Sequence, residues 1–292
     1  MDRQDIQAIV LRGERRERFA RYHLLTFGAG EPRRLLTRLV TEVSSADEIR
    51  ADGFRARRQF ALAASGLRAF GLNDPEMAQF SREFRQGMAH PERTLALGDV
   101  AADSPEHWAF GGPNTPRIDA LWMTFSDDAE HLDELSVQHE RLFARFEISF
   151  QIQQAPLTGD EPKRVPELGR RGRPKRLAPG EVVLGERDAI GERIHGPLVA
   201  IKHSARPLPA WVRTRNAQDF GRNGSYLVLR KLSRGDREWW LTALNTDLRR
   251  QFEFAQAEAE QSAPRSVRVR GGGYFFLPSV RALNYLAEGR VS

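Results

Sequence analysis

The order of strand and helix patterns in the first half of the chain restricts the fold more than any other feature. Arg21–Phe27 is rich in β-forming residues and predicts a strand, and Pro32 then opens a helix whose apolar residues repeat on one side. Further strands are predicted at 59–64 and 117–125, and a long amphipathic helix follows at 127–143. This alternation is typical of an α+β fold of ferredoxin-like type with antiparallel sheets.

The second half opens on a stretch of different composition. Residues 154–193 are dominated by proline, glycine and charged residues, so we expect a basic linker or loop there. Two strand-like runs at 226–232 and 239–244 flank six residues with a central glycine, which predicts a β-hairpin. The remaining expected elements are a helix at 247–261, a strand at 274–277 and a C-terminal helix capped by Ser279.

These patterns predict two ferredoxin-like domains, arranged in the manner of a dimeric α+β barrel. The expected domains are an N-terminal ferredoxin-like one at 1–145 and a truncated C-terminal one at 146–292.

The absence of cysteine among the 292 residues limits the chemistry of the chain. It excludes disulfides, thiolate nucleophiles and cysteine-ligated zinc, and it fits a reducing compartment. The longest apolar run, Phe60 to Ala64, is too short to span a bilayer, and residues 1–19 are charged throughout, unlike a secretory signal. We therefore expect a cytoplasmic protein with no membrane partner.

Several sequence blocks, taken in order, resemble those of the dye-decolourising peroxidase family. They span about residues 64 to 279, and their number and order favour a shared fold. The blocks are Ala64–Leu72, Phe80–Ala89, Leu97–Asp99, Ser104–Trp108, Pro179–Gly185, Phe220–Arg230, Gln251–Phe254 and Arg270–Ser279.

The departures from the family pattern concern haem. The family's GxxDG motif, which carries the acid–base aspartate, is expected at Phe146–Pro156, where neither the aspartate nor the glycines occur. The proximal histidine and distal arginine of the family lie between two strands that only the six residues 233–238 join in this chain. A haem peroxidase needs an axial ligand and a group that moves a proton between the peroxide oxygens. The resemblance therefore implies a haem-free pseudoenzyme without catalytic residues or cofactor, acting in binding, as a scaffold or in assembly.

Two histidines leave a peroxidase with non-standard ligands open as an alternative. His203 and His195 are the candidates if haem is bound, but they precede the strand that the proximal ligand should follow. The other histidines, His23, His90, His107, His131 and His139, show no HExxH or paired spacing, so no metal site is expected.

The net charge of +6 comes almost wholly from arginine, which supplies 41 of the 45 basic residues. A GC-rich genome explains this excess, whereas one local motif points to nucleic acid. Arg171-Gly172-Arg173-Pro174 resembles an AT-hook, in which an extended arginine-containing segment lies in the narrow minor groove of DNA. A solvated basic linker accounts for the same residues. The nucleic-acid candidates are Arg170, Arg171, Arg173, Lys175 and Arg176.

The expected partners follow from these alternatives. Because the family often forms oligomers, the resemblance implies a homo-oligomer or another protein partner, with DNA as the alternative partner.

Overall fold

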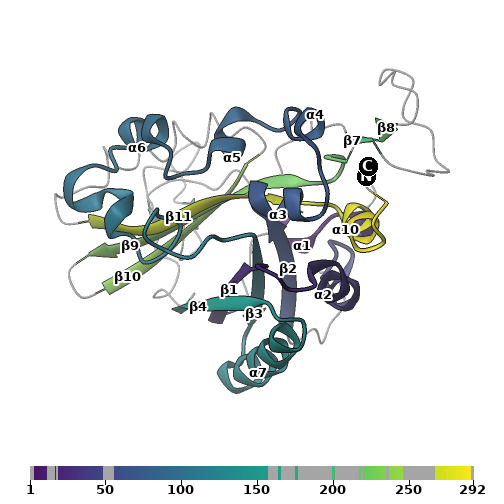
Figure 1. The fold of residues 1–292 in the computed structure, drawn as a ribbon. Coiled ribbons are helices and arrows are strands. Elements are labelled where there is room, and N and C mark those ends of the chain that lie inside the picture. Colours follow the sequence, from purple (N-terminus) through teal and green to yellow (C-terminus); the bar gives the residue numbers. More distant parts are fainter. Residues whose placement is uncertain are drawn as a thin grey trace.

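The computed structural model describes residues 3–11, 17, 19–48, 56–156, 164–165, 175–176, 199–200, 217–218, 220–234, 237–245 and 267–290. Seven antiparallel strands form one sheet in the order β10-β9-β11-β2-β3-β1-β4. Figure 1 shows α3 to α6 gathered over β9 and β11, with α2 and α7 at the other end of the sheet. The expected α+β class with antiparallel, ferredoxin-like strands is therefore confirmed.

The N-terminal half forms a complete ferredoxin-like unit whose strands lie in the order β2-β3-β1-β4. Its elements are β1 (Phe19–Thr26), α2 (Pro32–Leu39), β2 (Ala56–Leu62), β3 (Ala120–Ser126), α7 (Ala129–Arg145) and β4 (Ser149–Pro156). Pro32 starts α2, because its missing N–H would lack a partner there in any case, and the leucines at 35, 36 and 39 are buried. The α7 helix begins after Asp128, whose carboxylate accepts the Glu130 amide at 3.0 Å.

A helical insertion separates β2 from β3. It contains α3 (Ala64–Ala69), α4 (Asp74–Met77), α5 (Arg82–Gln86), α6 (Pro91–Leu97) and the short 3-10 turns η4 (Ala101–Asp103) and η5 (Pro105–His107). Side-chain caps start three of these helices: Asn73 for α4, Ser81 for α5 and His90 for α6. Capping lets these short helices form, because it supplies acceptors for N–H groups without a helical partner.

The C-terminal half adds the predicted hairpin and a longer last strand. Its main elements are β9 (Ser225–Arg234), β10 (Arg237–Asn245), β11 (Val267–Leu277) and α10 (Val280–Ala287). In the hairpin, Arg234 pairs with Arg237, which confirms the turn predicted there. Ser279 caps α10 as expected, accepting the Ala282 amide at 3.1 Å. Short two-stranded pairs join β5 (Arg164–Val165) with β6 (Lys175–Arg176) and β7 (Val199–Ala200) with β8 (Ala217–Gln218).

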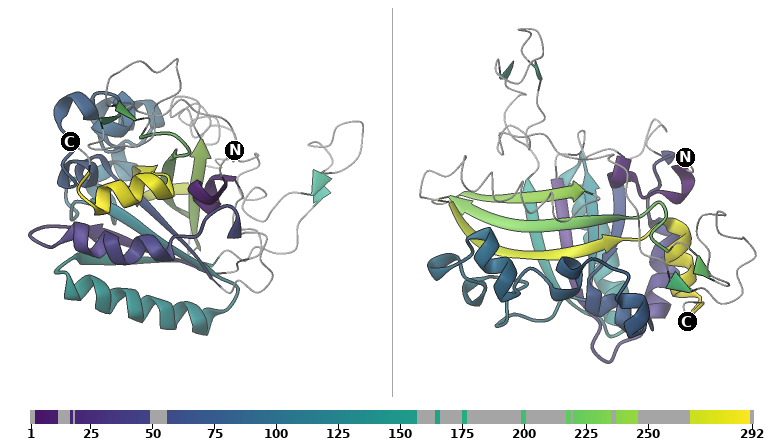
Figure 2. Two further views of the ribbon diagram at one scale, coloured as in Figure 1. Left: turned by 90° about the vertical axis from the view of Figure 1, so that its right-hand side faces the viewer. Right: turned by 90° about the horizontal axis from the view of Figure 1, so that it is seen from above.

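The sheet curls so that its two ends approach each other. Lys231 on β9 donates to Gln153 on β4 at 3.2 Å, although these strands are separated by four others in the sheet. The helices cover the outer face, where the larger hydrophobic core lies, and a second apolar cluster that includes Tyr22, Phe110 and Phe275 lies on the inner face. Figure 2 shows the curvature from two further directions.

The two halves of the sheet meet at a narrow seam. β11 pairs with β2 only at Phe276 and Leu62. Next to this pair, the Gln7 amide group donates at 2.8 Å to the carbonyls of both Phe60 and Pro278, and it accepts the Phe60 amide at 2.9 Å. Gln7 follows η1 (Arg3–Asp5) and precedes α1 (Ala8–Leu11). A buried side chain therefore replaces strand pairing where β2 and β11 part.

Two sequence expectations need correction. The strand β4, which begins after residue 145, pairs with β1 along its whole length. This strand lies within Phe146–Pro156, the segment expected to correspond to the GxxDG motif. Its last residues, 154–156, are also the first residues of the expected loop, so that loop begins later than predicted. The last strand begins at Val267 rather than 274, because three consecutive glycines hide its β pattern. The helix expected at 247–261 lies outside the described residues.

Candidate functional site

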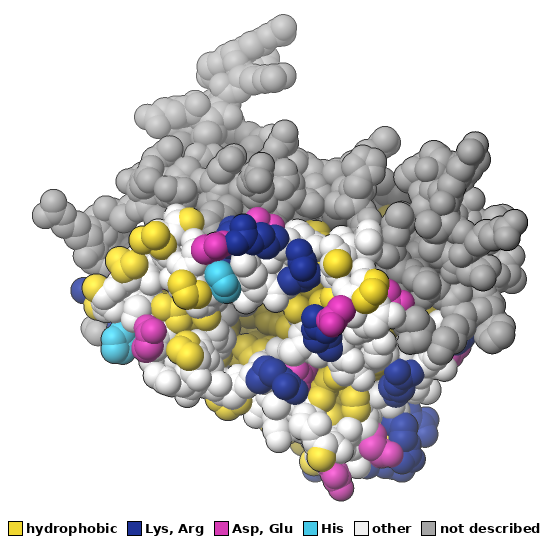
Figure 3. All heavy atoms as spheres, turned by 45° about the horizontal axis from the view of Figure 1, so that its top comes forward, with side chains coloured by type: hydrophobic (Ala, Val, Ile, Leu, Met, Phe, Trp, Pro, Cys, Tyr) yellow, Lys and Arg dark blue, Asp and Glu magenta, His cyan; other side chains and the backbone are white. Residues whose placement is uncertain are grey.

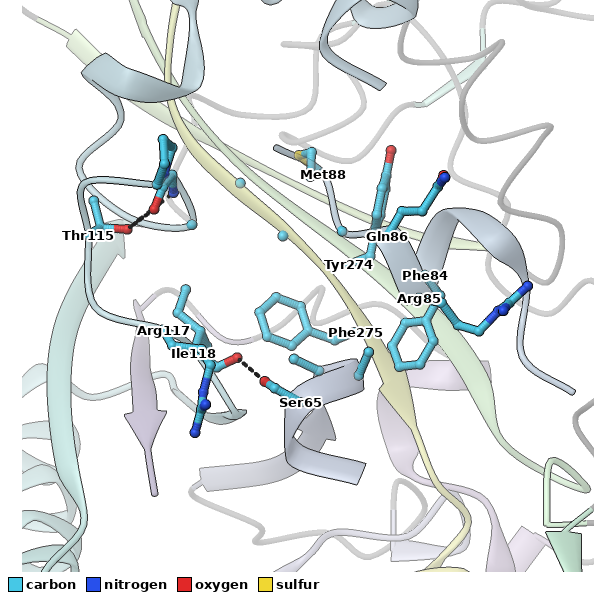
Figure 4. A pocket seen from close by; sticks show the side chains of 18 of the residues that line it. Ser65, Phe84, Arg85, Gln86, Met88, Thr115, Arg117, Ile118, Tyr274 and Phe275 are labelled. Atoms are coloured by element: carbon cyan, nitrogen blue, oxygen red, sulfur yellow. Dashed lines mark hydrogen bonds between the residues drawn. The ribbon is translucent and has the colours of Figure 1, made fainter. Parts of the chain in front are cut away.

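A cavity of about 420 Å³ lies beside β11, between the start of α3, the end of α5 and the loop that leads to β3. Figure 4 shows it from close by, with Phe275 and Met88 on opposite sides. Its volume is within the range of small-molecule sites, roughly 300–1,000 Å³. The lining residues are 63–65, 84–88, 111–113, 115–118 and 272–275.

The cavity opens because β2 ends while β11 continues. After Leu62, the Ala63 amide binds the Asp119 carbonyl at 3.0 Å and the chain turns into α3. Further along β11, the Gly272 amide points away from β9 and reaches the Phe110 carbonyl at 3.4 Å. Alternate residues of an antiparallel strand direct their peptide groups to the same side. The N–H and C=O of Tyr274, two residues from Gly272, therefore face the cavity.

Glycines shape the floor and one wall. A Cβ atom on Gly272 would collide with the sulfur of Met88, and one on Gly111 would collide with the Gly272 carbonyl. Gly111 also has a φ of 76°, a conformation that glycine adopts without strain. The absence of side chains at these positions brings the loop backbone directly onto β11, as expected for glycine within a strand.

Most of the remaining lining is apolar, with a few polar groups. Phe84, Met88 and Phe275 are buried hydrophobic residues of the wall. The Ser65 hydroxyl donates to the Ile118 carbonyl at 3.1 Å and is thereby engaged within the protein. The Gln86 carboxamide oxygen is buried without a hydrogen-bond partner among the described residues. The cavity can therefore take an apolar body and still offers polar groups to orient it.

Among the described residues that line the cavity, the charged ones are two arginines. Arg117 is bound to the buried Asp119 at 2.8 Å. Arg85 is exposed and donates its Nε to the Phe80 carbonyl at 3.1 Å. Figure 3 shows this face, where hydrophobic side chains floor a hollow that has both basic and acidic side chains around it.

A buried ion pair lies behind the cavity wall formed by Tyr274. Asp99 and Arg230 form a close ion pair with only 1% and 6% of their side chains exposed. Burial raises the pKa of Asp99 above its ordinary value, and the attraction of Arg230 offsets only part of this rise. Burial also raises the pKa of Tyr274, which stays neutral at physiological pH. This pair fastens the helical insertion to β9.

None of the described histidines lines the cavity. His23 on β1 and His139 on α7 are buried where this helix packs against the sheet, and they lie 3.1 Å from the Ser136 hydroxyl and 3.0 Å from Glu42 respectively. Burial lowers the pKa of His23 to about 4, so this ring is neutral at physiological pH. His90 caps α6, and His131 lies 3.7 Å from Glu134 on the surface of α7. His203 and His195 lie outside the described residues.

Two further sequence expectations concern metals and nucleic acid. Within the described ranges, no group of three or more potential ligands could hold a metal ion, and no helix is long and apolar enough to cross a membrane. Of the AT-hook-like segment, Lys175 and Arg176 form β6, where Arg176 pairs with Arg164. Arg170, Arg171 and Arg173 lie outside the described residues.

The structure brings together residues that the sequence did not mark as a site. Segments 63–65, 84–88 and 272–275 fall in or beside the blocks that carried the family resemblance, but their proximity depends on tertiary folding. The available signal was Gly271-Gly272-Gly273 next to an aromatic strand, because glycine inside a strand marks close approach of another group.

Comparison with solved structures identifies several dye-decolourising peroxidases with this fold. One such structure is 11% identical with a TM-score of 0.67 and covers 98% of each chain. The peroxidase of this type from Anabaena sp. is 12% identical with a TM-score of 0.63, covering 97% of this chain and 94% of its own. The enzyme from Auricularia auricula-judae is 17% identical with a TM-score of 0.52, covering 80% of this chain and 49% of its own.

The sequence itself matches no protein-family model and no curated protein. At identities this low, similarity to the solved structures concerns the fold. The chain has the fold of dye-decolourising peroxidases, as the sequence blocks predicted.

Proposed function

We propose that this chain is a haem-free binding protein built on the fold of dye-decolourising peroxidases. One observation carries the proposal. The β9 and β10 strands, between which the resemblance locates the haem-binding residues, pair directly as a hairpin from Arg234 and Arg237 onward. A connection of two residues between these positions has no room for an axial ligand, a distal arginine and the segments that would hold them.

The described residues also fit haem poorly. An axial ligand must present a free ring nitrogen or a comparable donor to the iron. The buried His23 and His139 each use Nε2 in a contact within the core, where their Nδ1 atoms are buried without a hydrogen-bond partner among the described residues, and His90 uses Nδ1 to cap α6. Neither these three nor the other described histidines reach the cavity. No described histidine therefore offers an axial ligand at the cavity.

Haem uptake tests the proposal directly. The protein would be purified from a haem-supplemented culture, its absorption recorded through the Soret region, and hemin titrated into it. We expect no Soret band and no saturable uptake. A stoichiometric band that disappears in His203→Ala or His195→Ala would establish haem binding through an unexpected ligand and overturn the proposal.

Association with duplex DNA is a second candidate, favoured by the β5–β6 pair. The backbone of Arg164 pairs with that of Arg176, and the sequence between these two residues contains Arg171 and Arg173. Salt-sensitive binding to an A·T-rich duplex, lost in the double variant Arg171→Ala/Arg173→Ala, is the expected result. Equal binding by this variant, or equal binding to a G·C duplex, would remove the candidate.

A further inference from the structure

We propose that the free edge of β4 is a dimer interface, where β4 of a second copy of this chain pairs antiparallel with it across a two-fold axis at Ile152. The inference goes beyond the proposed function by naming a partner, and it does not depend on whether haem binds.

The direction of the peptide groups on β1 determines which side of β4 is free. The Leu25 carbonyl on β1 accepts the amide of Asp119, just before β3, at 2.7 Å, so Leu25 faces β3. Alternate residues of an antiparallel strand face the same side, so Leu24 faces β4, where it pairs with Gln151. The peptide groups of Gln151 therefore point to β1, and those of the residues before and after it point away from the sheet.

The residues whose peptide groups point away are Phe150, Ile152 and Gln154. Their N–H and C=O groups have no hydrogen-bond partner among the described residues. Edge strands are commonly protected from pairing by charged residues, proline or a bulge. None of these interrupts β4 from Ser149 to Ala155, and its register with β1 is unbroken. A regular, unprotected edge of this kind accepts a further strand.

The curl of the sheet leaves this edge accessible. Gln153 accepts the Lys231 ammonium, and Gln151 donates to the Ala109 carbonyl at 3.1 Å. Both are side-chain contacts on the inner face of the sheet, and neither uses the outer backbone groups of β4. The Phe150 side chain on the outer face is 36% exposed in the folded chain.

The neighbouring helix makes a second copy the fitting partner. Figure 1 shows α7 beneath β3, β1 and β4. Near its start, Asp133 binds Arg21, which lies opposite Gln154 in the sheet. Near its end, Phe143 contacts the Phe150 ring. An antiparallel pair centred on Ile152 sets Phe150 opposite Gln154 of the second copy, so the start of each α7 lies beside the end of the other.

The surface of α7 is complementary to itself in this arrangement. Its exposed charged residues are acidic in the first half and arginines in the second half. They are Glu130, Asp133 and Glu134, followed by Arg141 and Arg145. The two-fold axis therefore brings opposite charges together at both ends of the interface. Val137, which is 44% exposed at the middle of α7, adds an apolar residue near the axis.

Light scattering during gel filtration of the full chain, over a series of concentrations, tests the proposal. Ile152→Lys and Ile152→Glu each place like charges opposite one another at the axis. Val100→Lys is the matched control, because it adds the same charge at an exposed apolar residue of the helical insertion. Because the chain contains no cysteine, Ile152→Cys and Val100→Cys provide a second measurement by disulfide cross-linking, should a charged variant fail to fold.

We expect dimers of the unmodified chain and of Val100→Lys, and at least about tenfold weaker association in each charged Ile152 variant. Mixing Ile152→Lys with Ile152→Glu should restore dimers, because opposite charges then meet at the axis. Mild oxidation should link Ile152→Cys into a covalent dimer and leave Val100→Cys monomeric. A chain that is monomeric at every concentration, association unchanged by the Ile152 variants, no recovery in the mixture of folded variants, or equal cross-linking at the two positions would overturn the proposal.

Discussion

Replacing Arg230 with methionine should destabilise the fold far more than removing an exposed arginine. The change leaves the Asp99 carboxylate, 1% exposed, without its cationic partner. Two unit charges about 4 Å apart attract by roughly 4 kcal/mol at an effective dielectric constant of about 20. Breaking one side of a buried pair costs about 3–5 kcal/mol, because a charge is then buried without compensation. We therefore expect a loss of about 3–5 kcal/mol in Arg230→Met.

The pKa of Asp99 adds a second, sharper expectation. Because burial raises this pKa despite Arg230, desolvation of the carboxylate costs more than the ion pair returns. Replacing both residues, in Asp99→Leu/Arg230→Met, should accordingly be less destabilising than Arg230→Met alone.

Urea denaturation followed by circular dichroism would measure these differences at pH 7. The reference is Arg68→Met, which removes an exposed pair with Asp74 at 2.6 Å and should cost at most about 1 kcal/mol. A loss in Arg230→Met no larger than in Arg68→Met would refute the reasoning. A loss of stability in the double variant equal to the sum of the losses in Asp99→Leu and Arg230→Met would refute it as well.

Three further changes test other parts of the structure. Stability should fall as pH is lowered from about 6.5 through 4, because His23 is neutral in the fold, with a pKa lowered to about 4, and takes up a proton more readily when unfolded. The urea midpoint should depend less on pH across this range in His23→Gln, and an unchanged pH dependence would contradict the assignment. Gln7→Leu should cost about 2–3 kcal/mol by leaving the Phe60 and Pro278 backbone groups unpaired, whereas a neutral effect in thermal denaturation would show that water satisfies them. Gly272→Ala should cost about 1–3 kcal/mol through its clash with the Met88 sulfur, and Met88→Ala in the same chain should recover part of that loss; no recovery would place the strain elsewhere.

Elements with a strong local pattern could be predicted from the sequence. The hairpin was evident because two β-rich runs flank a glycine-centred turn, and α10 because Ser279 precedes an apolar repeat. The Gly271–Gly273 part of β11 could not be recognised, since β propensity argues against glycine in a strand. These glycines are required by tertiary packing, because Gly271 lies under the Phe110 ring and Gly272 lies under Met88.

The candidate site was less accessible to prediction than the fold. Its walls come from segments that lie far apart in the sequence, so their proximity can be recognised only from the folded structure. The burial of His23 and His139 was missed for the same reason, because polar residues on strand and helix faces carry no periodic signal of their own.

The seam at Gln7 has a consequence for synthesis of the chain on the ribosome. The Gln7 amide joins Phe60, 53 residues away, to Pro278, which lies 271 residues away. Asp5 likewise accepts the backbone amide of Arg281 at 2.7 Å. Asp5 and Gln7 thus reach Arg281 and Pro278 only after the residues between them have been added, and until then the β2 edge of the ferredoxin-like unit lacks its contacts with the C-terminal half. We expect correct folding and edge-to-edge aggregation to compete while this edge is exposed in the nascent chain.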